Sequence, residues 1–145
     1  MSIIIDKLPK VTVVSKFGPR VRNGIKENHP GIDIRVVDAR YIQYPVIAQE
    51  DLRITGIQYS LKWGHAVHAK PINKNGFGID GFSYWHIVPG VKVGDELKAG
   101  DVIGKPESGY VDLHLHFETL VKKERIDPVP YLESLGAEIE YTKRS

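Results

Sequence analysis

Residues 113–118 read LHLHFE and carry the clearest pattern in the chain. Leu113, Leu115 and Phe117 alternate with His114 and His116. Side chains of a β-strand point alternately to opposite faces, so the apolar residues share one face and the two imidazoles share the other. The two imidazoles then lie about 7 Å apart along the backbone, at ~3.3 Å per residue. The segment predicts a strand whose polar face can line a site, although an ordinary half-exposed strand is the simpler alternative.

Short apolar or alternating runs recur along the chain, separated by 14 glycines and nine prolines. This spacing is typical of short strands and turns. We expect strands at residues 11–17, 32–37, 44–48, 52–61, 66–70, 82–88, 102–104 and 113–120. One short helix is expected at 129–135, with Asp127 as N-cap, Pro128 as its first residue and Gly136 at its end. The predicted fold class is mostly β: a single antiparallel domain, β-sheet or β-sandwich-like, with one short C-terminal helix.

Two Gly-Asp steps, Gly94-Asp95 and Gly100-Asp101, stand in VKVGDELKAGDVIG. Glycine adopts positive φ at little cost, so both steps predict chain reversals in a tight β meander. Residues 71–81, PINKNGFGIDG, predict a polar surface loop. We divide the chain into an N-terminal extension, one domain and a C-terminal tail, and expect both ends to be loose. The three parts are residues 1–10, 11–136 and 137–145.

The composition limits the available chemistry, because the chain has no cysteine and six histidines. Disulfides, thiolate zinc sites, iron–sulfur clusters and thiol nucleophiles are excluded, so any metal must bind imidazole and carboxylate groups. A net charge of +2, from 20 basic and 18 acidic residues, is too small to indicate a nucleic-acid partner. Neither a signal peptide nor the roughly 18 apolar residues of a membrane span are visible. We expect a soluble protein without membrane insertion.

His29 and Asp33 lie four residues apart in NHPGID, on either side of Pro30-Gly31. Proline followed by glycine specifies a type II turn, which we expect from His29 to Ile32. An extended chain would separate the two side chains by about 13 Å, at ~3.3 Å per residue, and the turn could bring them together. The alternative is a plain Pro-Gly turn beside a solvated aspartate.

The other three histidines are weaker candidates. His86 stands among aromatic residues in FSYWHIVPG, where a histidine is more often a packing residue than a catalyst. His65 and His68, in GHAVHAK, are three residues apart and so point to opposite faces of a strand. We assign structural roles to both of them.

Two imidazoles and one carboxylate from separate segments are a common ligand set for catalytic zinc. Zinc lowers the pKa of a bound water to about 7 and polarises a substrate carbonyl. A further histidine beside the metal can move protons near neutral pH. Spacing alone leaves open which four or five side chains assemble.

The order of these motifs resembles the lysostaphin-like zinc metallopeptidases, a family of peptidoglycan endopeptidases. SKFGPR resembles the family's opening strand and turn, HPGID its His-x-x-x-Asp motif, and YPVIA the strand that follows. YWH resembles its Tyr-x-His segment, VKVGDELKAGDVIG its hairpin, HLHFE its His-x-His strand, and IDPVPYL its closing Asp-Pro segment. The resemblance extends over residues 11–136.

The resemblance implies that His29, Asp33 and His116 bind one Zn²⁺ ion, with His114 and His86 as catalytic histidines. A water activated by the metal and by His114 would attack the scissile carbonyl. His86 and His114 would stabilise the oxyanion and return a proton to the leaving amine. The resemblance also implies a β-sheet groove that holds an extended peptide containing glycine or D-alanine.

Three features depart from the family's pattern. Some members place a tyrosine before the first zinc histidine to contact the oxyanion, whereas the first tyrosine here is Tyr41. Residues 107–113, ESGYVDL, are shorter and bulkier than the usual glycine- and threonine-rich turn, and the loop at 71–81 is longer than its equivalent. These segments fall on the expected groove walls, so they affect specificity more than chemistry.

The function expected from the sequence is a zinc-dependent endopeptidase that cleaves the peptide part of bacterial peptidoglycan. Without a visible export signal, a phage lysin or a virion-associated enzyme acting on the cell wall is the expected source. The alternatives are a non-catalytic β module of the same fold, serving in wall binding or as a structural component, and a zinc hydrolase of another fold. D-alanyl–diaminopimelate cross-links and glycine bridges both remain open as substrates, as do the host and the oligomeric state.

Overall fold

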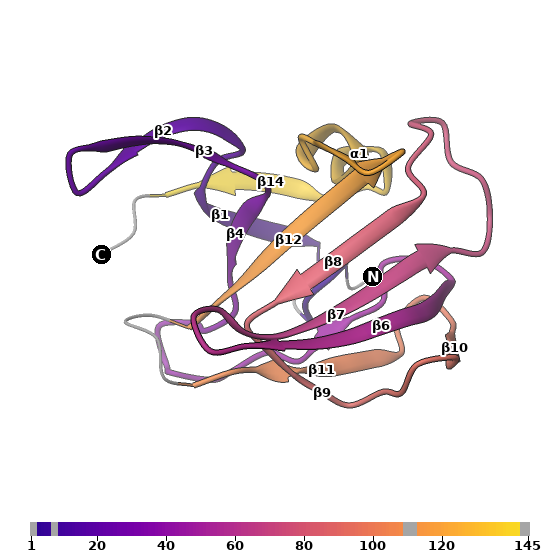
Figure 1. Ribbon diagram of the computed structural model, residues 1–145. Helices are drawn as coiled ribbons and strands as arrows, with labels where there is room; N and C mark the ends of the chain where they lie inside the picture. Colours follow the sequence, from indigo (N-terminus) through magenta and orange to yellow (C-terminus); the bar gives the residue numbers. More distant parts are fainter. Residues whose placement is uncertain (1–2, 7–8, 109–112, 143–145) are drawn as a thin grey trace.

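The computed structural model describes residues 3–6, 9–108 and 113–142, and within this part strands dominate (Figure 1). A nine-stranded sheet has the order β10 (Glu96–Leu97), β6 (Leu52–Ser60), β7 (Gly64–Pro71), β8 (Gly81–Trp85), β12 (His114–Val121), β4 (Ile32–Arg35), β1 (Lys10–Ser15) and β14 (Glu138–Tyr141), with β13 (Glu124–Ile126) paired to β12. A three-stranded sheet has the order β5 (Val46–Ile47), β11 (Val102–Pro106) and β9 (Ile87–Pro89). A separate ribbon pairs β2 (Gly18–Arg22) with β3 (Ile25–His29), and the described helix is α1 (Val129–Ser134). The predicted mostly β, antiparallel-dominated fold with one short helix is confirmed, since β1 and β14 are the only described strands that pair in parallel.

The centre of the large sheet has one apolar and one polar face. On β12, Leu115 and Phe117 are buried in the core, while His114 and His116 lie on the other face, as the alternation predicts. The neighbouring β4 repeats this arrangement, with Ile32 and Ile34 in the core. Antiparallel pairing of β12 with β4 and β8 therefore brings their polar faces together into one surface.

The core packs against the apolar face of the large sheet and is closed by the small sheet, by the helix and by residues near the N-terminus. Phe82 and Phe117 stack with ring centroids 6.0 Å apart, and Tyr131 of α1 packs on Phe82 at 5.3 Å. Ile103 of β11 is fully buried in the same cluster. Close packing on this side fixes the strands whose other face carries the polar residues. No helix among the described residues is both long and apolar enough to span a membrane.

The strand predicted at 82–88 is interrupted at His86. The backbone of His86 has φ = 69°, in the left-handed region that ends regular pairing, so the chain leaves the large sheet there. β8 ends before this residue and pairs with β12, whereas β9 begins after it and pairs with β11 of the small sheet. Periodicity could not detect this change of sheet, because both halves are equally apolar.

The two Gly-Asp turns are confirmed, but the tight meander between them is wrong. Gly94 and Gly100 have φ of 94° and 95°, and Asp95 and Asp101 each accept a hydrogen bond from the backbone N–H three residues earlier, at 2.8 Å. β10 and β11 do not pair with each other, since β10 joins β6 in the large sheet and β11 lies in the small one. Residues 72–80 form the predicted connection between β7 and β8, with most side chains exposed.

The ends of the chain correct two further expectations. The helix begins at Val129 as the predicted range has it, but Pro128 is its N-cap and not its first residue. Asp127 is therefore not the N-cap, and it accepts a hydrogen bond from the Val129 N–H at 3.0 Å. The ends are not loose where they are described. Ile3, Ile4 and Ile5 are buried in the core, and β14 pairs in parallel with β1. The domain boundaries themselves stay a prediction.

Candidate metal centre

Strand register places Asp33 of β4 directly opposite His116 of β12. Directly opposed residues of an antiparallel pair have side chains close enough to interact. Nδ1 of His116 lies 2.9 Å from Oδ1 of Asp33, and both side chains are buried. Two of the three predicted ligands are thus brought together by the sheet itself.

His29, the third predicted ligand, comes from the end of β3. Its Nε2 lies 3.3 Å from Oδ1 of Asp33, and the three candidate ligand atoms of His29, Asp33 and His116 lie within 4.8 Å of one another. The predicted type II turn is wrong, because Gly31 does not have the positive φ that this turn requires. Glycine is needed there for space, since a Cβ at this position would lie 2.3 Å from the backbone oxygen of Phe117.

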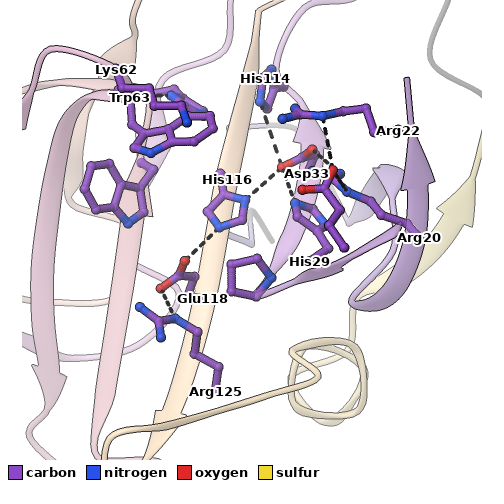
Figure 2. A pocket seen from close by; sticks show the side chains of 14 residues that line it. Arg20, Arg22, His29, Asp33, Lys62, Trp63, His114, His116, Glu118 and Arg125 are labelled. Carbon is purple, nitrogen blue, oxygen red and sulfur yellow. Dashed lines mark hydrogen bonds and ion pairs between the residues drawn. The ribbon is translucent and has the colours of Figure 1, made fainter. Parts of the chain in front are cut away.

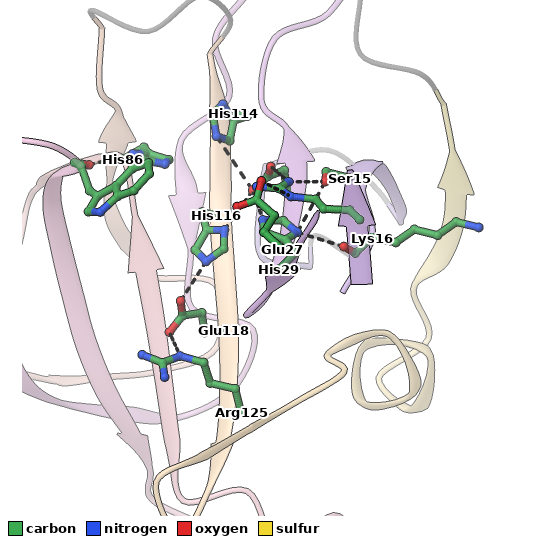
Figure 3. A network of polar contacts seen from close by, with 12 residues as sticks. Ser15, Lys16, Glu27, His29, His86, His114, His116, Glu118 and Arg125 are labelled. Carbon is green, nitrogen blue, oxygen red and sulfur yellow. Dashed lines mark hydrogen bonds and ion pairs between the residues drawn. The ribbon is translucent and has the colours of Figure 1, made fainter. Parts of the chain in front are cut away.

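The outer nitrogen of His29 is tied to the β1–β2 connection (Figure 3). Nδ1 lies 2.9 Å from the backbone oxygen of Lys16 and 3.4 Å from Oγ of Ser15. A carbonyl oxygen only accepts hydrogen bonds, so Nδ1 carries the proton. Nε2 of His29, the nitrogen that faces Asp33, is therefore the one available to a metal.

His116 is oriented by an acidic residue that the sequence analysis did not single out. Its Nε2 lies 2.8 Å from Oε2 of Glu118, which shares the polar face of β12, and Arg125 of β13 holds the other oxygen of Glu118 at 3.0 Å (Figure 2). An ionised carboxylate only accepts, so His116 donates from Nε2 to Glu118 and from Nδ1 to Asp33. Glu118 holds the ring so that Nδ1, once it loses its proton, is the nitrogen available to a metal. The period of two along β12 could have revealed Glu118, because it follows His116 by two residues.

The three charged groups at the centre support one another. Burial alone would raise the pKa of Asp33, but the hydrogen bonds and charges of His116 and His29 hold it far below its usual range. Burial would likewise lower the pKa of His116, yet the hydrogen bonds to Asp33 and Glu118 raise it. Glu118 has a lowered pKa, because His116 and Arg125 outweigh the effect of burial. Asp33 is therefore ionised near neutral pH, the form that a metal ligand needs.

His114 and His86 flank this cluster. Nε2 of His114 lies 3.9 Å from Oδ1 of Asp33, and the rings of His114 and His86 are 4.7 Å apart. Nδ1 of His86 donates to the backbone oxygen of Trp63 at 2.8 Å, which leaves its lone pair on Nε2. Burial, aided by the charge of His114, lowers the pKa of His86 to about 4. His86 is therefore neutral near pH 7.

A frame outside the pocket holds the backbone of His86. Its N–H donates to the backbone oxygen of His65 at 2.9 Å, and its own carbonyl accepts from the N–H of Glu107 at 2.9 Å. The Glu107 carboxylate in turn accepts from the N–H of His65 at 3.0 Å and contacts Nδ1 of His65 at 2.5 Å. His68 contacts Ser83 and Gln58 at 2.8 Å. Neither His65 nor His68 lines the described pocket.

A pocket of ≈ 490 Å³ opens above the cluster (Figure 2). The ribbon β2–β3 supplies one side of it, and the turn before β7, together with the end of β8, supplies the other. Its described lining residues are Arg20, Arg22, Glu27, His29, Pro30, Asp33, Lys62, Trp63, Trp85, His86, His114, His116, Glu118 and Arg125. All five predicted site residues therefore face one cavity. The expected turn at 107–113 lies partly outside the described residues.

Comparison with known proteins gives matches at the level of structure. No family model and no curated protein sequence matches the chain. The catalytic domain of the antimicrobial peptidase lysostaphin from Staphylococcus simulans matches with a TM-score of 0.66 and 27% identity, over 83% of this chain and 91% of that one. A zinc-containing peptidase from Vibrio cholerae matches with a TM-score of 0.66 and 22% identity, over 86% of this chain and 37% of that one. A structure of the SpoIIQ–SpoIIIAH pore-forming complex matches with a TM-score of 0.69 and 19% identity, over 90% of this chain and 89% of that one.

The chain has the fold of the lysostaphin-like zinc metallopeptidases, which confirms the resemblance found in the sequence. It spans 57% of a longer lysostaphin chain, against 91% of the catalytic domain alone. The pore-forming complex shares the fold at lower identity, so the fold by itself does not distinguish a peptidase from a structural module. That distinction depends on the residues of the pocket.

Proposed function

We propose that this chain is a zinc-dependent endopeptidase that hydrolyses peptide cross-links or bridges of bacterial peptidoglycan. The arrangement of His29 and His116 supports this most strongly. Each imidazole has one nitrogen engaged by an outer acceptor and presents the other to Asp33 inside a buried cluster. Packing histidines need no such matched orientation, whereas metal ligands regularly show it.

The donor set fits zinc. Nε2 of His29, Oδ1 of Asp33 and Nδ1 of His116 would hold the ion, and two imidazoles with one carboxylate are a ligand set of catalytic zinc sites. When bound, zinc supplies Lewis acidity, which polarises the scissile carbonyl and makes a water nucleophilic near neutral pH. The three ligands lie at the floor of the pocket, so an extended peptide in the groove would place its carbonyl against them.

His114 and His86 supply proton transfer in this proposal. His114 is the nearer to Asp33, so it takes the proton of the attacking water and passes it to the leaving amine. His86 is neutral and presents Nε2 as an acceptor, since Trp63 binds its other nitrogen. It therefore orients the water or the protonated His114, and it stabilises the oxyanion only after receiving a proton itself.

The other candidate function is a non-catalytic module of the same fold. The likeness to the pore-forming complex favours this alternative, because that structure is named for an assembly and not for a peptidase. A module of this kind needs neither an oriented ligand set nor two further histidines in the same pocket. A phage or virion-associated origin stays a prediction from the sequence.

Metal analysis combined with wall lysis tests the proposal on the purified chain. We expect wild type to bind one zinc and to reduce the turbidity of purified peptidoglycan. His116→Ala should lose both zinc and lysis, His114→Ala should keep zinc and lose lysis, and His68→Ala serves as a matched histidine control outside the pocket. Absence of zinc from wild type overturns the enzyme proposal. Zinc without release of peptides supports the non-catalytic module, and normal lysis by His114→Ala contradicts its assigned role.

A further inference from the structure

Two arginines of the ribbon β2–β3 face the pocket. Arg20 and Arg22 are two residues apart on β2, so they lie on the same face of the ribbon, and Glu27 of β3 stands directly opposite Arg20. One oxygen of Glu27 accepts a hydrogen bond from Nε of Arg20 at 3.2 Å and forms an ion pair with Nε of Arg22 at 3.1 Å. Glu27 thus serves both guanidinium groups, and Arg20 has a second carboxylate nearby in Asp33.

The two guanidinium groups differ in what else they contact. Nη1 of Arg20 donates to Oγ of Ser15 at 2.6 Å and lies 3.8 Å from Oδ2 of Asp33, which places this arginine beside the candidate metal ligands. Within the described part of the chain, Arg22 has Glu27 as its ion-pair partner and no other. Half of its side-chain surface is exposed. The terminal nitrogens of Arg22 are therefore available to a ligand at the outer part of the pocket.

Among the described residues, the opposite side of the pocket contributes no acid that is free of another partner. Nζ of Lys62 lies 4.8 Å from the centre of the Trp63 ring, and no ion pair to Lys62 occurs among the described residues. Glu118 is already paired with Arg125. Asp33 belongs to the candidate metal cluster and also pairs with Arg20 at 3.8 Å. The described lining therefore carries four cations, Arg20, Arg22, Lys62 and Arg125, against three carboxylates, Glu27, Asp33 and Glu118. The walls carry an excess of positive charge, which attracts an anionic ligand.

We propose that Arg22, together with Arg20, forms a subsite for a substrate carboxylate close to the scissile bond. The planar guanidinium fork binds a carboxylate through two parallel hydrogen bonds. Arg20 lies next to the metal ligands and Arg22 is two residues farther along β2, about 7 Å at ~3.3 Å per residue. The carboxylate thus lies within about two residues of the cleaved amide.

This subsite favours one of the two substrates that the sequence left open, which are D-alanyl–diaminopimelate cross-links and glycine bridges. A cross-link made through an amino acid such as diaminopimelate leaves a free carboxylate on the carbon that bears the leaving amine. A glycine bridge has no charge near its cleaved bond. The substrate class is therefore a carboxylate-bearing peptide cross-link, and this inference rests on the proposed endopeptidase function.

Three synthetic substrates test the subsite with zinc-loaded protein. They are a diaminopimelate cross-linked peptide with its free carboxylate, the same peptide with that carboxylate amidated, and pentaglycine. We expect wild type to prefer the first over the second by about tenfold or more in kcat/KM, the size expected of a charge-assisted contact. Arg22→Gln should lower this ratio about tenfold, mostly through KM, and keep its zinc. Lys26→Gln removes an exposed cation from the same ribbon outside this pocket and should keep the wild-type ratio.

The outcomes separate the subsite from the proposed function. Wild type that cleaves none of the three peptides counts against the endopeptidase itself. Cleavage of pentaglycine in preference, or equal cleavage of the free and amidated peptides, overturns the subsite and leaves the peptidase intact. An Arg22→Gln variant that slows both diaminopimelate peptides by the same factor also overturns it, because a structural role of Arg22 would not depend on the substrate carboxylate.

Discussion

Oε2 of Glu118 lies 2.8 Å from Nε2 of His116, and this contact determines which nitrogen of His116 faces Asp33. Arg125 holds the other oxygen of Glu118, so the carboxylate is fixed from both sides. The pair has the geometry of a carboxylate that orients a metal-binding histidine. Loss of the Glu118–His116 contact should therefore weaken zinc binding more than it lowers the free energy of unfolding.

Removal of this carboxylate should weaken zinc binding. Glu118→Ala leaves Nε2 of His116 without its acceptor, so the imidazole can turn and Nδ1 is no longer held towards the site. We expect a loss of zinc affinity of about 10- to 100-fold, measured by competition with a chromogenic chelator. Glu118→Gln keeps an acceptor oxygen, so its zinc affinity should fall less than that of Glu118→Ala. Glu124→Ala, an exposed change on β13, is the control, and equal affinity in all three variants would contradict the assignment.

The polar face of β12 was predictable, whereas its partners were not. Alternation in LHLHFE places His114 and His116 on one face, because it depends only on the local geometry of a strand. The same rule extends to Glu118, two residues farther on. The register that sets Asp33 against His116 joins residues 83 positions apart, and no local pattern contains it.

Glu107 should act on catalysis through the position of His86. Glu107 binds the N–H and Nδ1 of His65 and donates its own N–H to the carbonyl of His86. Glu107→Gln places an amide against Nδ1 of His65, so the hydrogen bonds that hold the backbone of His86 change. We expect kcat to fall about 10- to 100-fold, the cost of a misplaced catalytic group, with KM and zinc content unchanged. Steady-state kinetics with a defined peptide measures kcat and KM separately.

A purely structural role for Glu107 predicts a different result. In that case the variant should lose stability, and its kcat per folded molecule should match wild type. The pH profile adds a second readout, because a displaced His86 would shift the acidic limb of kcat and a structural defect would not. Glu133→Gln, an exposed change on α1, controls for the charge removed.

His29 shows where prediction from sequence fails. Pro30-Gly31 indicated a type II turn, and the two ligands were expected to converge through it. They do converge, but Gly31 lacks positive φ and is glycine because the backbone of Phe117 passes close by. The ribbon β2–β3 and the break at His86 were missed for the same reason. Both depend on tertiary contacts and not on local periodicity.

His68 should make stability depend on pH. Burial lowers its pKa below the ordinary 6.5, and Arg125 lowers it further against the opposing charge of Glu118. The unfolded chain therefore binds this proton more readily than the folded one, so the free energy of unfolding should fall as pH drops below about 6.5 and level off below the folded pKa. In His68→Gln the free energy of unfolding should depend less on pH over this range. Urea unfolding at several pH values measures this dependence. A midpoint for the His68 ring above 6.5 in an NMR titration would reverse the sign.

Gly31→Ala should destabilise the fold and the site together. The added Cβ would meet the backbone oxygen of Phe117 at 2.3 Å, and neither backbone can move without shifting His29 or β12. Overpacking of this kind costs about 1–3 kcal/mol in the free energy of unfolding, measured by urea unfolding. Gly76→Ala is the matched control, because a Cβ there has nothing within 4 Å and the residue lacks positive φ. The control should be neutral or stabilise slightly. Equal stability of the two variants, or unchanged zinc affinity in Gly31→Ala, would show that the close approach does not hold His29 in place.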